Sequence, residues 1–492
     1  MARPDYDVAI IGAGPAGLSV AHALSSASGG ACRVAVFERV PRFTPRGAGF
    51  TLLANGLEAL RGICPQVYKR VTAEGHRVLR GRMCKIDGTV LSEMNEDSHP
   101  SREMEREWGH PWVSWAWSDL QQLLADELPG NVSLHLGEKL EGLRQAGGDD
   151  AREEQGGGSG NAGGSGSVVE LKFQGHDKPV TASVVVGADG YWSKVRQAAV
   201  GDGPPSDVGT AMWRARLDRE FVAGFDIPHG STVSCLGGGM AFLLFPLSND
   251  QTAWVASTPA QRLHELGVQW PPQREQRPGQ QQLMSMLGGG GDEFSEQARR
   301  QGEAAKTRVL AAFEPLAAPM RELIAATDPS VIVEHGLFIR PAEDMTEQAF
   351  GKGRVAIVGD AAHAVRPTGQ GLNMAFEDAY HLARHLALAS AAARAAPGGG
   401  EPGGWLAGAD VGGALAAWRG ARLPRVARIM AHAQAQGAAA YKRDATPVSA
   451  PLRMGPDEVK AWNQFVYGIK VEPLSALAGP PAAVQEGAAH PA

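Results

Sequence analysis

The spacing of hydrophobic positions divides the chain into two kinds of region. Toward both ends, short apolar runs such as DVAIIG (7–12) and RVAIVGD (354–360) alternate with stretches that repeat every 3.6 residues, as helices do. In the middle, AFLLFPL (241–247) and TAWVAS (252–257) have the length and composition of strands without intervening helical periods. The pattern therefore predicts an α/β domain that is interrupted by a second, β-rich domain.

Shifts in composition give the expected domain boundaries. The α/β domain is expected in three parts, at residues 1–85, 111–205 and 346–445, the last of which includes the C-terminal helices. The second domain is expected in two parts, at residues 86–110 and 206–345. The Gly-rich segment 147–167 predicts a flexible insertion at the tip of a hairpin between NVSLHL (131–136) and VVELKF (168–173). Residues 446–492 predict an extension that is largely a disordered tail.

Bulk properties exclude several classes of partner. The formal net charge of -6 provides no basic footprint, so we expect no nucleic-acid partner. The 4 cysteines lack CxxC spacing, which indicates free thiols and no metal site. An apolar strand begins within a few residues of Met1, and no apolar run reaches the roughly 18 residues of a membrane span. We therefore expect a cytoplasmic protein without a transmembrane segment.

The first motif is IIGAGPAGLSVAHAL, in which Gly12, Gly14 and Gly17 form G-x-G-x-x-G between a strand and a helix. Gly12 permits a tight turn, Gly14 lets a pyrophosphate approach the backbone, and Gly17 lets the helix pack on the strand. The next strand ends in Glu38, whose carboxylate can accept hydrogen bonds from ribose hydroxyls. The motif predicts dinucleotide binding, and the alternative is a tight turn without a ligand.

The second motif, VVVGADGYWSKVR (184–196), places Asp189 directly after a strand. On its own, this motif is better explained as an ordinary strand-to-loop turn with a capping aspartate.

The third motif, VGDAAHAVRPTGQGLN (358–373), closes a strand with Asp360 and then starts a helix. Asp360 can accept hydrogen bonds from a polyol. Backbone N–H groups at Gly369, Gly371, Leu372 and Asn373 can stabilise negative charge on a heterocycle.

In this order the three motifs resemble those of the group A flavoprotein monooxygenases, single-component FAD hydroxylases similar to salicylate and para-hydroxybenzoate hydroxylases. The resemblance spans most of residues 5–440 and includes EDA (377–379) after the third motif. It implies an α/β fold with a Rossmann-like FAD-binding domain of the GR2 type. That domain would be interrupted by an α+β substrate domain with a mixed β-sheet.

The resemblance also implies which residues bind FAD. The pyrophosphate would contact the first motif, and the adenosine end of FAD would contact Glu38 and Arg39. The flavin would lie near the other two motifs. The implied cofactor residues are Gly12, Ala13, Gly14, Ala16, Gly17, Glu38, Arg39, Arg46, Asp189, Asp360, Pro367, Gly369, Gly371, Leu372 and Asn373.

One position departs from the family pattern. Where the family usually carries an FAD-contacting arginine, VSWAWSDLQQLL (113–124) offers Trp117, and Arg46 is the candidate to replace the missing contact. Trp115 and Trp117 are two residues apart, as on one face of a strand, and core packing is the favoured interpretation for both.

Other candidates are weaker. Pro367 and Arg214 are named as neighbours of the active site, although Arg214 could equally belong to a solvent-facing row with Arg216. His381 and His385 lack a third metal ligand, so we predict no metal.

Two further positions near the third motif are not assigned to catalysis. His363 is interpreted as a turn residue with local hydrogen bonds. Glu377 and Asp378 are adjacent on a helix, which disfavours a paired acid/base role.

The expected function is an FAD-dependent monooxygenase. NADH or NADPH would act as a transient donor, and a flavin C4a-hydroperoxide would pass one oxygen atom of O2 to an aromatic or other apolar organic substrate. Such flavin-borne chemistry requires no catalytic triad. The alternatives are an FAD-dependent reductase or oxidase without oxygen insertion, and a non-catalytic dinucleotide-binding protein. A monomer or homodimer is expected.

Overall fold

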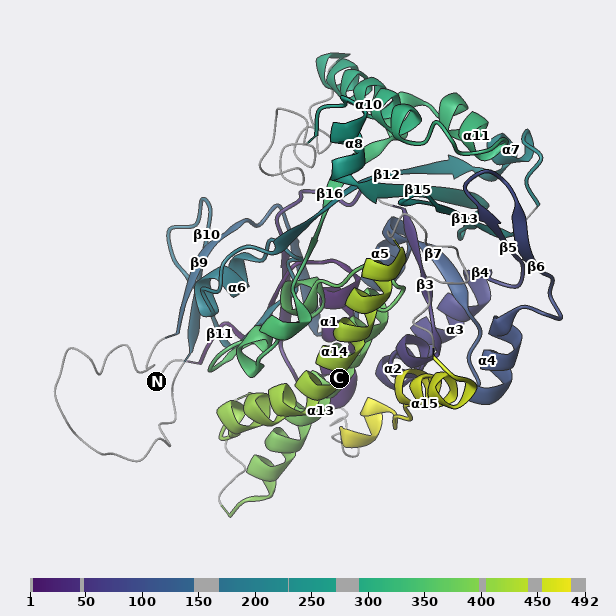
Figure 1. Ribbon diagram of the computed structural model, residues 1–492. Helices are drawn as coiled ribbons and strands as arrows, with labels where there is room; N and C mark the ends of the chain where they lie inside the picture. The colour runs from purple at the N-terminus through teal and green to yellow at the C-terminus, as the bar shows by residue number, and fades with distance from the viewer. Residues whose placement is uncertain are drawn as a thin grey trace, which may run out of the picture.

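The computed structural model describes residues 3–44, 48–145, 168–228, 230–270, 292–397, 404–440 and 454–478. Two seven-stranded sheets and one three-stranded sheet carry the fold (Figure 1). Among the described residues, no helix is both long and apolar enough to cross a membrane.

The first large sheet has a parallel centre and an antiparallel edge. Its strands are β8 (Val132–Leu136), β2 (Val34–Glu38), β1 (Tyr6–Ile11), β11 (Val180–Gly187), β17 (Val355–Ile357), β10 (Val169–Phe173) and β9 (Leu140–Gln145). β11 pairs with β10 through its first residues and with β17 through its last. In this register Ile11, Gly187 and Ile357 lie side by side. The strands that precede the three motifs therefore end at the same edge of the sheet.

The hairpin around the Gly-rich insertion is present, but its first strand is not the one expected from the sequence. β10 pairs antiparallel with β9, whereas NVSLHL forms β8 and joins β2 in parallel. The prediction that NVSLHL forms the hairpin is therefore wrong. In this position β8 extends the parallel part of the first sheet beside β2. The insertion itself, residues 147–167, lies outside the described residues.

The second large sheet is mixed, as the resemblance implies. Its order is β16 (Val333–Ile339), β12 (Ser206–Asp218), β15 (Gln251–Pro259), β14 (Met240–Pro246), β13 (Thr232–Gly237), β5 (Gly81–Lys85) and β6 (Val90–Met94). Only β13 and β5 pair in parallel among these strands. The part of the second domain that was expected at residues 86–110 thus begins earlier, and it contributes strands to this sheet from residue 81 onward.

Helices cover one face of the mixed sheet (Figure 1). They are α7 (Arg219–Ala223), α8 (Ala260–Glu265), α10 (Asp292–Ala312), α11 (Met320–Ala326) and the 3-10 turn η2 (Pro329–Val331). Trp213, Trp254 and Phe313 are fully buried in the core between sheet and helices. The opposite face is turned toward α5 (Trp117–Asp126), since Arg216 on β12 donates to Ser118 Oγ over 2.8 Å.

The remaining elements of the chain pack around the parallel sheet. The helices are α1 (Pro15–Ser28), α2 (Ala54–Ile63), α3 (Pro65–Glu74), α4 (Pro100–Trp108), α5 (Trp117–Asp126), α6 (Lys194–Ala199), α12 (Asp360–His363), α13 (Gly371–Ala395) and α14 (Val411–Ala440). The small sheet is β3 (Gly49–Leu52), β7 (Val113–Ala116) and β4 (His76–Arg77), and two 3-10 turns, η3 (Ala342–Asp344) and η4 (Glu347–Phe350), precede β17.

The C-terminal extension contains ordered structure that its composition does not predict. α15 (Pro456–Tyr467) packs on α2 and η5 (Leu474–Leu477) on α1, α2 and α13, and Leu474 is fully buried. Tyr380 donates to the Glu472 carbonyl over 2.8 Å, and Glu58 accepts from the Val471 N–H over 3.0 Å. Tertiary contacts thus fix a segment whose local sequence gives no strong signal. Residues 441–453 and 479–492 lie outside the described residues.

Candidate cofactor site

The glycine turn after β1 is closely packed against the second motif. Gly12 has a φ of 105°, and a Cβ there would overlap the Ala188 carbonyl. A Cβ on Gly17 would overlap the Gly12 carbonyl, so the first turn of α1 lies directly on the turn. Both positions therefore require glycine.

The N-terminus of α1 is open in the way that anion binding requires. Its N-cap is Gly14, no side chain caps it, Pro15 occupies the first turn and no acidic residue is present there. A Cβ on Gly14 would meet only Trp117 Cζ2, at 3.7 Å. The free N–H groups and the positive end of the helix dipole therefore remain available to a pyrophosphate.

Glu38 is held beside this turn by two backbone donors. Its carboxylate accepts from the Ala13 N–H over 2.9 Å and from the Val40 N–H over 3.1 Å. A carboxylate has about four acceptor positions, so Glu38 can still accept from ribose hydroxyls. The neighbouring Arg39 is exposed, and Arg46 lies outside the described residues.

Asp189 is engaged in holding α6. It accepts from Ser193 Oγ over 2.5 Å and from the Lys194 and Val195 N–H groups over 2.6 and 3.2 Å. Burial raises the pKa of its carboxyl, and these donors oppose the rise. Its Cα also lies 3.0 Å from where a Gly12 Cβ would stand. The side chain thus shapes the turn that borders the glycine motif.

The third motif lies against the first. A Cβ on Gly359 would be 3.2 Å from Ala16 Cβ and 3.4 Å from Ala375 Cβ, so this glycine sits between α1 and α13. Asp360 follows it, and its Oδ1 lies 3.7 Å from where a Gly371 Cβ would stand. The Asp360 side chain is open to solvent on one side, yet surrounding protein atoms still raise the pKa of its carboxyl. The Asp360 carboxylate, at the start of α12, therefore lies close to the first residue of α13.

Asn373 fixes the glycine bend before α13. Its amide donates to the Gly369 and Thr51 carbonyls over 2.6 and 3.2 Å, and its oxygen accepts from the Leu53 N–H over 3.0 Å. The side chain is fully buried, so it positions the bend and leaves only its backbone for a ligand. Pro367 and Gly369 are exposed beside it, and Leu372 is half-buried.

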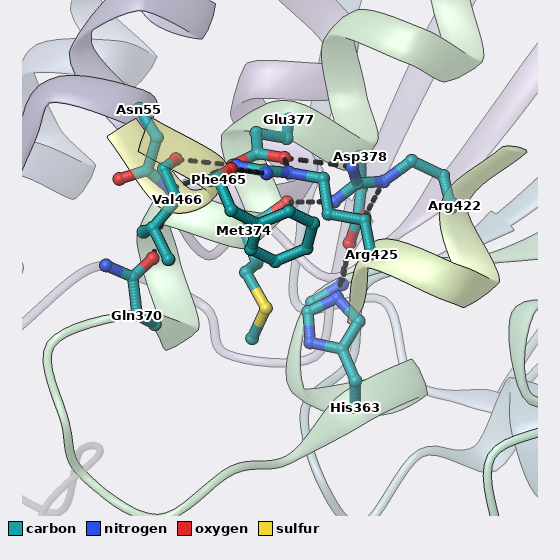
Figure 2. A network of polar contacts seen from close by, with 11 residues as sticks. Asn55, His363, Gln370, Met374, Glu377, Asp378, Arg422, Arg425, Phe465 and Val466 are labelled. Carbon is teal, nitrogen blue, oxygen red and sulfur yellow. Dashed lines mark hydrogen bonds and ion pairs between the residues drawn. The ribbon is translucent and has the colours of Figure 1, made fainter. Parts of the chain in front are cut away.

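A buried ionic network underlies this region (Figure 2). Asp378 Oδ2 accepts from the Gly359 N–H over 3.0 Å and lies 2.6 Å from His363 Nε2, while its Oδ1 accepts from Arg422 Nε over 2.9 Å. Glu377 accepts from Arg422 Nη1 over 2.9 Å. His363 therefore binds a residue fifteen positions away, and the prediction of local hydrogen bonds is wrong.

The same network extends to α2 and α15. Arg425 donates to both oxygens of Glu377, over 2.6 and 2.8 Å, and to the carbonyls of Phe465 and Val466. Asn55 on α2 donates to Glu377 over 2.8 Å and to Gln370 over 3.0 Å. The start of α13 is thereby tied to three other helices.

Trp115 and Trp117 occupy different environments. Trp115 is buried in β7 and donates to the Val71 carbonyl over 3.0 Å. Trp117 begins α5 and is 38% exposed, and α5 is anchored to the glycine turn because Gln121 donates to the Ala13 carbonyl over 2.7 Å. The prediction that both residues pack on one strand face is wrong, because the strand ends at Ala116. Trp117 lies beside Gly14 instead.

His381 and His385 lie one turn apart on α13. His385 Nδ1 lies 2.7 Å from the His381 carbonyl, and burial lowers the pKa of His381 to about 4. No group of three or more potential ligands occurs among the described residues. The four cysteines are free thiols.

Comparison with known proteins identifies the family. A family model described as an FAD binding domain matches residues 5–283 and 319–396. The chain belongs to the group A FAD-dependent monooxygenases. It is therefore an FAD-dependent oxidoreductase, and the open N-terminus of α1 behind Gly12 and Gly14 fits the pyrophosphate of that cofactor.

Relatives of this flavoprotein cover most of its length. The aurachin C monooxygenase/isomerase of Stigmatella aurantiaca is 28% identical over 77% of this chain and 80% of its own. The 3-amino-4-hydroxybenzoate 2-monooxygenase of Streptomyces cremeus is 28% identical over 77% and 78%. HpxO of Klebsiella pneumoniae, solved with FAD and uric acid, matches the fold with a TM-score of 0.63, at 18% identity over 94% and 93%.

Several residues of the flavoprotein's site were not foreseen from sequence. Arg422 and Arg425 are spaced three apart on α14, as a helix face requires, but only the fold shows that both pair with Glu377 on α13. The sequence shows that Trp117 stands where the family usually carries an arginine. It does not show that Trp117 lies beside Gly14.

Proposed function

We propose that this flavoprotein uses NADH or NADPH and inserts one oxygen atom of O2 into an aromatic or other apolar organic substrate. The observation that supports the proposal best is the register of β1, β11 and β17. The strands that precede the three motifs all end at the same edge of the sheet. This edge lies at the carboxyl ends of parallel strands, where α/β folds bind their ligands.

The residues at that edge have separable roles toward FAD. The N-terminus of α1 would bind the pyrophosphate, Glu38 the ribose and Asp360 the polyol chain. Backbone N–H groups of Gly371 and Leu372 would present the positive end of α13 to the ring. When bound, FAD supplies hydride acceptance from the donor and activation of O2.

The substrate would bind between the FAD site and the mixed sheet. Relatives are named for acting on 3-amino-4-hydroxybenzoate, and HpxO is solved with uric acid, so planar ring compounds are the favoured substrate class. The sequence carries no second dinucleotide motif, which supports a donor that visits the flavin transiently. We further propose a cytoplasmic monomer or homodimer.

The test is oxygen incorporation by the purified, yellow protein. Candidate ring compounds are screened for those that accelerate NADH or NADPH oxidation, and products are then formed under 18O2. One labelled atom per product molecule is expected. Flavin reduction and O2 consumption with unlabelled product throughout would instead identify an oxidase or reductase.

A further inference from the structure

Gln370 stands directly before α13, in the bend that begins at Gly369. Its side chain is buried, and its backbone carbonyl accepts from the Met374 N–H over 2.9 Å, which starts the helix. The N–H groups of Gly371 and Leu372 come next, and the first turn of α13 carries no acidic residue. Whatever holds the Gln370 side chain therefore helps to fix the direction in which these N–H groups point.

Two polar side chains hold the Gln370 amide, and they come from opposite ends of the chain. The amide oxygen accepts from Asn55 on α2 over 3.0 Å. The amide nitrogen is left to donate to the hydroxyl oxygen of Tyr467, the last residue of α15. Burial raises the pKa of Tyr467, and this hydrogen bond opposes the rise. Because the two ends of an amide have different chemistry, the two partners fix its orientation as well as its position.

Tyr467 is itself held firmly. The carbonyls of Phe465 and Val466, directly before it, accept from Arg425, and Val466 is buried. The Tyr467 ring packs on an apolar cluster from α2, α4 and the segment after α4, namely Ala54, Met104, Trp108 and Trp112. A side chain whose backbone and ring are both fixed can position the group that its hydroxyl contacts.

The segment that carries Tyr467 lies beyond the part of the chain that the family model matches, which ends at residue 396. A second tyrosine joins this segment to α13, since Tyr380 donates to the Glu472 carbonyl over 2.8 Å. Tyr380 lies nine residues after Gly371, whereas Tyr467 contacts the residue before it. The two tyrosines thus each provide one hydroxyl between α13 and the C-terminal segment, and of the two it is Tyr467 that acts at the bend.

We propose that Tyr467 is a positioning residue that acts through Gln370 and sets where the N–H groups of Gly371 and Leu372 stand relative to the flavin ring. This inference rests on the proposed function, which places those N–H groups at the ring. Reduction of the flavin by two electrons with uptake of one proton leaves one negative charge on it, and the positive end of α13 stabilises that charge. A displaced bend therefore weakens binding of reduced FAD more than binding of oxidised FAD.

The test compares the two-electron reduction potential of bound FAD in the holoenzyme and in Tyr467→Phe, measured without oxygen against a reference dye. Tyr467→Phe removes the hydroxyl and keeps the ring. It should weaken binding of reduced relative to oxidised FAD about tenfold, which lowers the potential by about 30 mV for a two-electron couple. An unchanged potential overturns the proposal.

Tyr380→Phe is the matched control for a merely structural effect. It also removes one hydroxyl between α13 and the C-terminal segment, so both variants should lose about 1 kcal/mol of stability and have a lower Tm. The potential should stay unchanged in Tyr380→Phe. An equal fall of the potential in both variants would show that it follows stability alone, which overturns the proposal.

A double variant tests the route through Gln370. Gln370→Met removes the amide, so adding Tyr467→Phe to it should lower the potential no further, whereas shifts that add would show independent action and overturn the proposal. These measurements use neither O2 nor an organic substrate. Absence of labelled oxygen from every product would therefore contradict only the proposed function, and an unchanged potential in Tyr467→Phe would contradict only the role of Tyr467.

Discussion

Asp378 and His363 form a fully buried hydrogen-bonded pair, with 2.6 Å between Asp378 Oδ2 and His363 Nε2. The same oxygen accepts from the Gly359 N–H over 3.0 Å, one residue before Asp360. A side chain on α13 thereby fixes the backbone directly before Asp360, the carboxylate that we propose for FAD binding. Figure 2 shows Arg422 closing the arrangement from α14.

Replacing Asp378 by Asn should destabilise the protein strongly. The change leaves the Arg422 charge buried with one carboxylate fewer, and breaking a buried pair costs about 3–5 kcal/mol. The free energy of unfolding in urea measures the effect. Asp218→Asn is the control, because Asp218 makes no capping hydrogen bond and should change stability by less than about 0.5 kcal/mol. Equal effects of the two changes would contradict the role of the network.

Stability should fall in acid because of Glu377. Burial alone would raise the pKa of Glu377, but the charges and hydrogen bonds of Arg422 and Arg425 outweigh it and lower the pKa to about 2. As pH falls below the ordinary value of 4.5, the unfolded chain takes up this proton first. The contribution is therefore complete above pH 4.5 and is lost toward pH 2. Thermal unfolding between pH 6 and 3 should show a shallower decline in Glu377→Gln, and parallel curves would refute the assignment.

Asp360→Ala should purify with little FAD. The carboxylate lies near Gly371 in the third motif and makes no hydrogen bond to the described residues that would hold the motifs in place. The ratio of flavin to protein absorbance measures bound cofactor, and we expect a loss of affinity of about tenfold or more. Shortening the 147–167 insertion should leave that ratio unchanged. Normal flavin content in Asp360→Ala would remove this residue from the FAD site.

Trp117 should report FAD binding by its fluorescence. Its ring lies beside Gly14, at the position where the family usually carries arginine. FAD added to apoprotein should therefore quench a component of the emission that is missing in Trp117→Phe. Trp462→Phe on α15 is the matched control and should leave the quenching intact. Trp117→Arg, which restores the family residue, is expected to bind FAD at least as tightly, and weaker binding would show that the tryptophan itself is required.

The features of this protein that depend only on local geometry can be predicted from its amino-acid sequence. Gly12 has a positive φ, and both Gly12 and Gly17 pack so closely on neighbouring backbone that only glycine fits. The spacing of these glycines therefore predicts the turn from the sequence alone. The alternation of strands and helices likewise follows from periodicity, and it was sufficient for the fold class.

The tertiary structure alone decided which charges are paired and which are not. Arg214, Arg216 and Arg422 are chemically identical, yet one has no partner in the described residues, one binds α5 and one is buried between two carboxylates. Their environments come from strands and helices far apart in the chain, and desolvation and ion pairing depend on that arrangement. For the same reason Trp117, a core residue by its spacing, lies beside Gly14, because β7 ends one residue before it.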